Sequence, residues 1–490
     1  MGRIRGASLA VVAACLPLAC SAILGIHDIG ETSEGGSESG SDAASELGPD
    51  SNAESSPTTD AADSALTDRD AGTVPNDSGY DGEAGVPVAP VSIPVPSTAD
   101  IIAPSGTPGQ RHLLYVPDSW WVFYLDSPTG LNVLQTPDHL PIVWSNSSLP
   151  AVTSYTFASA AALDGRLFGL DVTESGDVHL AMSAAGVTQP KSHILGTLNP
   201  NGGLMIGAAT SLGAYQTTGL DGVVTAVEEP EAGAGATLNV LDYGSVLPVA
   251  DAAAQAQTGA FQLDDTGHGA FSVSSFATVH TTSSPVVTRA ALPAAGGFTA
   301  VWNEEGSGIQ VATYSTASSS WTATSPLDTT SSQLVTRSWT ACALLGSGAV
   351  HVLWSTPQGG FVHMEGSGGG WGSAAAPPLL GVAAVELFAA CGPTGFTLFT
   401  VAPPATSGFA AGTILMSSWG GSAFTPWVAA VAPPGGATTR CFLSGFDRVV
   451  SGSASDPGPH VGLLWTESSS TSCQTAQPTN LSMAVVPVPP

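Results

Sequence analysis

The chain has 490 residues, and 39 acidic side chains against 10 Lys and Arg residues give it a formal net charge of −29 at pH 7. Binding to nucleic acid or to an anionic membrane surface requires a basic surface, so this charge balance argues against both classes of partner. Only 10% of the residues are charged. Gly, Ala, Ser and Thr supply most of the remaining polarity, which is typical of an extracellular β-protein with many tight turns.

The N-terminus has the order of a signal peptide. Arg3 and Arg5 precede a 14-residue apolar stretch, Gly6 to Ala19, which is shorter than the roughly 20 residues that span a bilayer. Cys20 follows directly, and this order resembles a bacterial lipoprotein, whose cysteine is acylated after cleavage. The resemblance implies a signal peptide over residues 1–20 and a lipid on Cys20. Cys15 is the alternative acylation site, and an ordinary cleaved secretory signal is the alternative to both.

The residues after Cys20 indicate where the protein is sorted and how it is tethered. Ser21 stands where inner-membrane lipoproteins often carry Asp, so the resemblance implies an exported lipoprotein at the outer membrane or cell surface. From His27 to Asp100 the chain holds 16 acidic residues and one base, Arg69. Such a segment buries too little apolar surface to offset the entropy of ordering. We therefore expect a disordered acidic tether over residues 21–108 and a folded domain over residues 109–490.

A glycine followed by apolar residues recurs in the second half of the chain, at intervals of 51, 47 and 50 residues. The four copies are Gly297–Trp302, Gly348–Trp354, Gly395–Phe399 and Gly445–Val450. A second apolar segment follows in Gly308–Tyr314 and Gly360–Met364, and Trp321, Trp371 and Trp427 close several units. Three or four short strands per ~50 residues, separated by Gly, Ser and Pro turns, are typical of a β-propeller blade.

Weaker copies of the unit precede these. An early blade is predicted from Trp120–Tyr124 with Leu131–Leu134. The next blade is predicted from Gly165–Leu170 with Gly176–Leu180, and two poorer copies are predicted within residues 208–290. No helical period of 3.6 residues is sustained. The sequence thus predicts an all-β domain, a β-propeller of seven or eight four-stranded blades with six as an alternative, because a closed ring removes exposed strand edges. A pair of β-sandwiches is the rival fold.

The blade-closing tryptophans and paired glycine-apolar strands resemble the sialidase-like and related lectin propellers. Their Asp-box turn runs Ser/Thr-x-Asp-x-Gly-x-Thr-Trp, whereas the nearest segment, Thr136–Trp144, lacks the glycine and is one residue longer. The resemblance implies a lectin-like protein or, alternatively, a sialidase-like glycoside hydrolase. Such a hydrolase needs a tyrosine nucleophile with a carboxylate partner; the early Arg-Ile-Pro motif of the family is absent. The available groups are Tyr314, Glu304, Glu305, Asp264 and Asp265, and we expect binding rather than hydrolysis, without a cofactor.

Three Thr-Arg pairs precede equivalent inner strands, and their arginines are Arg289, Arg337 and Arg440. If the inner strands line the axis of a ring, these guanidinium groups share one rim, where they are suited to chelate a carboxylate or sulfate. The alternative is that the arginines only reflect repeat ancestry and are solvated.

Four cysteines in an exported domain imply two disulfides. Cys342, Cys391 and Cys441 lie 49 and 50 residues apart at similar inner-strand positions, and Cys473 completes the set. We expect Cys342–Cys391 between adjacent units and Cys441–Cys473 within the last unit. A metal site is disfavoured because no Cys-x-x-Cys spacing occurs.

His179 and His363 share a Val-His-apolar context, and His351 is on a neighbouring strand. We interpret them as hydrogen-bonded strand histidines rather than zinc ligands. The function that the sequence predicts is a membrane-anchored lipoprotein whose propeller binds a glycan or protein ligand. The alternatives are the glycoside hydrolase and a structural scaffold of the envelope.

Overall fold

The computed structural model describes residues 87–93, 112–116, the strands between Ser119 and Asp328, and, beyond residue 337, residues 338–367, 370–404, 408–435, 439–451, 458–468 and 480–489, with a few single residues besides. Between residues 153 and 282 this description covers the backbone alone. Every regular element in these ranges is a β-strand, which confirms the all-β prediction. Residues Gly79–Pro490 form one compact unit.

The described strands form seven antiparallel sheets, and the first three lie in the half of the chain where the repeats are weakest. The first contains β2 (Leu113–Val116), β3 (Ser119–Ser127), β4 (Gly130–Pro137) and β5 (Thr153–Thr156). The second contains β6 (Leu163–Val172), β7 (Asp177–Ala184), β8 (Ser192–Asn199) and β9 (Gly203–Ser211). The third contains β10 (Thr217–Thr218), β11 (Val223–Glu228), β12 (Thr237–Val246), β13 (Gln255–Asp265) and β14 (Phe271–Thr282).

The other four sheets follow the regular repeats. The fourth contains β15 (Val286–Ala294), β16 (Gly297–Glu304), β17 (Gly308–Ser315), β18 (Ser320–Trp321) and β19 (Ser325–Asp328). The fifth contains β20 (Trp339–Ala343), β21 (Val350–Ser355), β22 (Phe361–Ser367) and β23 (Gly370–Ser373). The sixth contains β24 (Leu387–Cys391), β25 (Phe396–Val401), β26 (Ile414–Trp419) and β27 (Val428–Val431). The seventh contains β28 (Thr439–Gly445), β29 (His460–Ser468), β30 (Asn480–Pro487) and, from the other end of the chain, β1 (Val91–Ile93).

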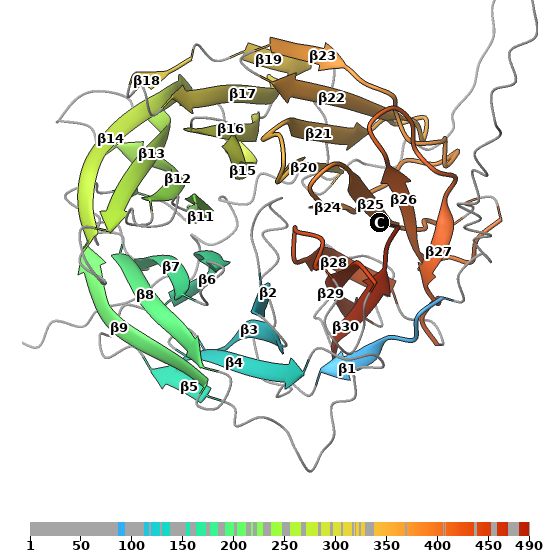
Figure 1. The fold of residues 1–490 in the computed structure, drawn as a ribbon, viewed down its shortest axis with the longest axis horizontal. Coiled ribbons are helices and arrows are strands. Elements are labelled where there is room, and N and C mark those ends of the chain that lie inside the picture. The colour runs from blue at the N-terminus through green and yellow to red at the C-terminus, as the bar shows by residue number, and fades with distance from the viewer. Residues whose placement is uncertain are drawn as a thin grey trace, which may run out of the picture. The chain divides into compact units, whose positions relative to one another are not determined.

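The sheets follow one another around a common centre, and one strand of each is innermost (Figure 1). The contacts between these inner strands make a complete circuit: β2 contacts β6, β11 contacts both β6 and β15, β20 contacts β15 and β24, and β28 contacts β24 and β2. Antiparallel sheets repeated radially in this way are the arrangement of a β-propeller, which leaves only short strand edges unpaired. The described residues therefore have a β-propeller-like fold.

The N-terminal and C-terminal ends of this unit meet in one sheet. β1 pairs antiparallel with β30, with Val91 opposite Met483 and Ile93 opposite Leu481. Ile93 is only 2% exposed, so its burial contributes to closing the ring. The predicted tether of residues 21–108 is therefore wrong at this point. The short apolar run Val91-Ser92-Ile93 supplies the outer strand of the last sheet instead of remaining solvated.

The sequence repeats correspond to the second strands of consecutive sheets, with one exception. Gly297–Trp302, Gly348–Trp354 and Gly395–Phe399 coincide with β16, β21 and β25. Gly445–Val450 does not form such a strand, because Val449 and Asp447 hydrogen-bond to Cys391 of the preceding sheet. The equivalent strand is β29, which contains Gly462-Leu463-Leu464-Trp465. In the earlier part, one complete sheet, β10–β14, lies within residues 208–290, where the sequence predicts two poorer units, and the two ends of this range belong to β9 and β15.

Apolar side chains fill the spaces between neighbouring sheets. One buried cluster joins the β20–β23 and β24–β27 sheets and includes Leu353, Phe361, Leu398 and Trp419. A second cluster joins the β24–β27 sheet to the last sheet and includes Trp465. Because side chains alternate along a strand, each sheet contributes one face to each neighbouring interface. These interfaces between sheets hold the candidate functional groups.

Candidate functional site

The three predicted arginines are at or close to the start of innermost strands. Arg289 is on β15 and pairs with Trp302 of β16, but its side chain lies outside the described residues. Arg337 also lies outside them, two residues before β20 begins. Arg440 is on β28 and is 1% exposed. The predicted convergence of the three guanidinium groups thus stays a prediction. Arg440, whose side chain is described, is buried and does not lie on an exposed rim.

Arg440 binds groups within the protein. Its Nη1 donates a hydrogen bond to the Gly412 carbonyl over 3.0 Å, and its Nε lies 3.6 Å from a carboxylate oxygen of Glu467. The guanidinium carbon lies 5.0 Å from the centre of the Trp465 ring. Trp465 Nε1 donates to the same Glu467 oxygen over 3.2 Å.

The environment of Arg440 is that of a buried structural cation. Burial lowers the pKa of its guanidinium group below the ordinary value, and the charge and hydrogen bond of Glu467 oppose that change. An arginine keeps its charge in proteins, so the carboxylate and the ring are needed to compensate the lost solvation. The hydrogen bond to Gly412, just before β26, links the last sheet to the β24–β27 sheet, whereas Glu467 is opposite Arg440 within the last sheet itself.

Glu386 is a second buried charged group at this interface, at 2% exposure. Its two carboxylate oxygens accept hydrogen bonds from the backbone N–H groups of Phe442 and Leu443, each over 3.3 Å. Phe442 has a φ of 61°, in the left-handed region that non-glycine residues seldom adopt. The carboxylate therefore stabilises the irregular part of β28 between Cys441 and Ser444, where the pairing with β29 shifts register.

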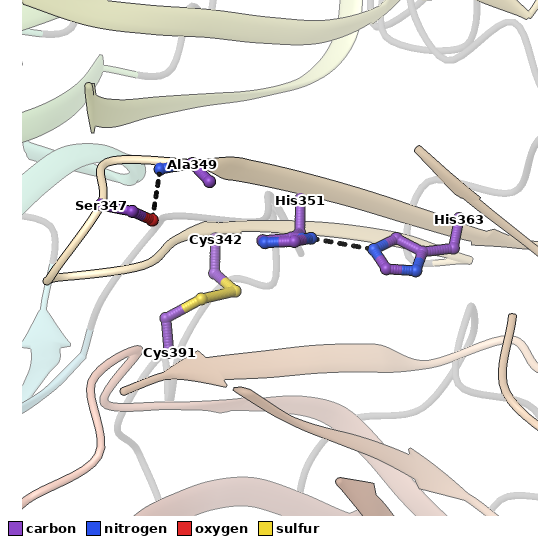
Figure 2. Close-up of a disulfide and its surroundings, with 6 residues drawn as sticks. All are labelled: Cys342, Ser347, Ala349, His351, His363 and Cys391. Atoms are coloured by element: carbon purple, nitrogen blue, oxygen red, sulfur yellow. Dashed lines mark hydrogen bonds between the residues drawn. A yellow bond between two sulfur atoms is a disulfide. The ribbon is translucent and has the colours of Figure 1, made fainter. Parts of the chain in front are cut away.

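The predicted disulfide between Cys342 and Cys391 is present (Figure 2). It joins β20 to β24, the innermost strands of two neighbouring sheets. The Cα atoms are 5.9 Å apart, and both cysteines are 1% exposed. Cys441 is also disulfide-bonded. Its partner must be Cys15, Cys20 or Cys473, all outside the described residues, so the Cys441–Cys473 pairing stays a prediction.

Two of the predicted strand histidines form a buried pair beside this disulfide. His351 is opposite Cys342 in the β20–β21 register, and its Nδ1 lies 3.0 Å from Nε2 of His363 on β22 (Figure 2). His363 Nδ1 lies 2.7 Å from the Ala375 carbonyl oxygen. The two side chains are 0% and 1% exposed. The side chain of His179, on β7, lies outside the described residues.

These contacts determine which ring nitrogen carries the proton in each of the two neutral histidines. A backbone carbonyl only accepts hydrogen bonds, so His363 Nδ1 carries a proton and its Nε2 has a lone pair. His351 Nδ1 must then donate to that lone pair, which leaves His351 Nε2 unprotonated. Burial lowers the pKa of His351 from 6.5 to about 3, with a smaller contribution from His363. Burial also lowers the pKa of His363, against opposing effects of Ala375 and Glu365.

The groups that a sialidase-like reaction would need are not arranged for it in the described residues. Tyr314 is 4% exposed and packs against Phe298 and Trp321, with ring centres 5.6 and 5.3 Å away. Glu304 is 4% exposed and accepts a hydrogen bond from Ser307. Glu305 and the side chains of Asp264 and Asp265 lie outside the described residues. A tyrosine enclosed by aromatic rings is a core residue, not an accessible nucleophile.

Metal-binding clusters and membrane-spanning helices are both absent from the part of the chain that the structure describes. It contains no group of three His, Cys, Asp or Glu side chains that could hold a metal ion. None of its segments is a helix of the length and apolarity that crossing a bilayer requires.

No protein-family model matches the chain, and no curated protein matches it. Similar solved structures include a polysaccharide lyase, an ulvan lyase of family PL25, with a TM-score of 0.44, 10% identity, and coverage of 81% of this chain and 96% of the lyase. A NanB sialidase mutant from Streptococcus pneumoniae has a TM-score of 0.40, 8% identity, and coverage of 75% and 83%. A mutant of the Aleuria aurantia lectin, in complex with Fucα1-6GlcNAc, has a TM-score of 0.36, 11% identity, and coverage of 66% and 99%. Matches at these identities and TM-scores define neither a family nor a ligand for this chain.

Proposed function

We propose that this protein is an exported, lipid-anchored β-propeller of seven blades that binds a glycan or protein ligand outside the cytoplasm. The observation that carries the proposal is the complete circuit of contacts between inner strands, which brings distant segments of the chain around one centre. Loops held by such a rigid scaffold are the usual location of binding residues.

Export is supported by the Cys342–Cys391 disulfide, because disulfides persist in oxidising compartments and are rare in the cytosol. The lipid anchor rests on Cys20, with Cys15 as the alternative. β1 is the outer strand of its sheet, so a tether that precedes it joins the propeller at the periphery.

The ligand chemistry that we propose is a carboxylate or sulfate group, bound by Arg289 and Arg337. Residues 101–490 contain only seven bases against 23 acids, so two guanidinium groups near one axis form a distinctive anion site. Arg440 is excluded from ligand contact in this proposal because it is buried against Glu467 and Trp465.

A glycan array with the full chain tests the binding proposal, using neutral, carboxylated and sulfated glycans. Arg337→Ala and Arg289→Ala are each expected to weaken binding of an anionic glycan by about tenfold to a hundredfold, the range for a lost charge-assisted hydrogen bond. Arg448→Ala, which removes the same charge next to Phe446, is the matched control and is expected to bind normally. Equal losses in all three variants would contradict the assignment.

A protein ligand is tested by crosslinking on intact cells, where Arg337→Ala is expected to abolish recovery of the partner. Crosslinks that persist in Arg337→Ala would favour a structural envelope scaffold.

Metabolic labelling with a fatty-acid analogue tests the anchor separately, and Cys20→Ala is expected to abolish the label whereas Cys15→Ala retains it.

A further inference from the structure

Adding a proton to the neutral His351–His363 pair is unfavourable at either available nitrogen in the folded structure. One candidate nitrogen is His351 Nε2, which is buried and has no hydrogen-bond partner among the described residues. The other is His363 Nε2, and protonating it breaks the hydrogen bond to His351. Either position costs free energy, because a buried charge without a partner loses its solvation.

The side chains that face the pair from the neighbouring sheet are aromatic. The His351 ring centre lies 4.7 Å from the Trp419 ring of β26 and 5.0 Å from the Phe396 ring of β25. The His363 ring centre lies 5.7 Å from that of Phe424, in the turn that follows β26. The segments that face the pair, β24, β25, β26 and the turn to Trp427, contain no Asp, Glu, Lys or Arg.

Formal charges are scarce throughout this pair of sheets. From Trp339 to Thr439 the sequence contains two, Glu365 and Glu386, and no Lys or Arg. Glu365 is on β22, opposite His351 in register, and is half-buried. Glu386 binds Phe442 and Leu443 of the last sheet instead. Among the described residues around the pair, Glu365 is therefore the carboxylate that can offset a positive charge.

From this geometry we propose that the interface between the β20–β23 and β24–β27 sheets is sensitive to acid and opens locally when the histidine pair is protonated. The Cys342–Cys391 disulfide keeps the two sheets connected in the open state. The disulfide joins the innermost strands, β20 and β24. The histidines are on β21 and β22, farther from the centre (Figure 1). Opening therefore pivots about the inner strands.

Opening separates side chains at the outer part of the interface. Phe361 parts from Trp427, whose ring centre is 5.6 Å away in the closed interface, and His363 parts from Phe424. The loop that supplies Ala375 also accepts a hydrogen bond from Trp427 through the Pro378 carbonyl. Protonation thus exposes an aromatic surface that is covered at neutral pH.

Hydrogen exchange followed by mass spectrometry tests this proposal on the full chain at pH 7.5 and 5.5, after correction for the chemical exchange rate. Each histidine that is protonated only in the open state raises the opening constant by about tenfold over this interval, so the pair raises it by about a hundredfold. The increase is expected in β21, β22, β25 and β26. The strands β16 and β17, which contain no histidine, are the internal reference and are expected not to change.

Two variants assign the effect to the pair. His363→Gln retains an N–H donor for the Ala375 carbonyl, and His351→Phe fills the aromatic environment; each is expected to reduce the response to about tenfold. His112→Gln, at a buried histidine of another sheet, is the matched control and is expected to leave the response unchanged. A response confined to the reference strands, or retained in both variants, would overturn the proposal.

Nitrogen-15 NMR of histidine-labelled wild-type protein provides a readout that does not depend on the variants. Both rings are expected to be neutral with the proton on Nδ1 at pH 7.5, and to become protonated only as the interface exchange accelerates. Protonation of His351 and His363 without a change in exchange would also overturn the proposal.

Discussion

Replacing both Cys342 and Cys391 with alanine is expected to lower the free energy of unfolding by about 5 kcal/mol, about 4 from the lost crosslink and about 1 from lost packing. The two cysteines are 49 residues apart, and in the chain-entropy model a crosslink that closes a loop of about 50 residues destabilises the unfolded chain by about 4 kcal/mol at 25 °C. Both side chains are buried in a cluster with Leu398 and Trp419. Removing the sulfur atoms therefore adds a packing loss on the order of 1 kcal/mol.

Equilibrium unfolding in urea of the wild type, the two single variants and the double variant separates the crosslink from the packing. Either single substitution breaks the disulfide, so each is expected to cost nearly as much as the double substitution. The coupling free energy in this cycle should be about 4 kcal/mol. Single losses that simply add to the double loss, or a double loss below about 1 kcal/mol, would refute the reasoning.

Three other changes have expected outcomes that the same unfolding assay measures. Glu467→Gln removes the carboxylate beside the buried Arg440 and should cost about 2 kcal/mol, less than for a fully buried pair because Glu467 is 17% exposed; no measurable loss would contradict this. Gly366→Ala places a Cβ 2.7 Å from the half-exposed Trp371 ring, and moving that ring should lower the free energy of unfolding by about 1 kcal/mol. Gly372→Ala is the control that should leave stability unchanged, because the added Cβ meets no atom within 4 Å. Burial lowers the pKa of His112 from 6.5 to about 4, so its contribution to stability is complete above pH 6.5 and is lost as the pH falls from 6.5 toward 4. The loss is about 2 kcal/mol at pH 5, and an equal pH dependence in His112→Gln would disprove it.

The sequence predicts strands well where a glycine precedes alternating apolar residues and a turn follows. Gly297–Trp302, Gly348–Trp354 and Gly395–Phe399 fulfil these conditions and coincide with β16, β21 and β25. Gly445–Val450 has the same local pattern but pairs with Cys391 of another sheet, and nothing local distinguishes it from Gly462–Trp465. Val91–Ile93 is not recognisable as a strand in the sequence, because a three-residue run between prolines becomes one only through its partner β30.

The groups of the candidate site also differ in whether the sequence alone predicts them. The Cys342–Cys391 disulfide is predictable because a repeat of nearly constant length places the two cysteines at equivalent positions in adjacent sheets. The burial of Arg440 is not, because it depends on Trp465 and Glu467, which a local Thr-Arg pattern does not specify. The contact between His351 and His363 depends likewise on the register of β21 and β22 and on a loop carbonyl.

The closed ring is tested most directly by an engineered crosslink between the two ends of the domain. Ser92 and Ser482 are directly opposite each other in the β1–β30 pair, although most of the chain separates them in the sequence. In Ser92→Cys/Ser482→Cys, we predict an intramolecular disulfide between these positions under mild oxidation, identified by peptide mapping of the monomer. Absence of that crosslink, or its formation only between separate molecules, would contradict a ring closed by β1.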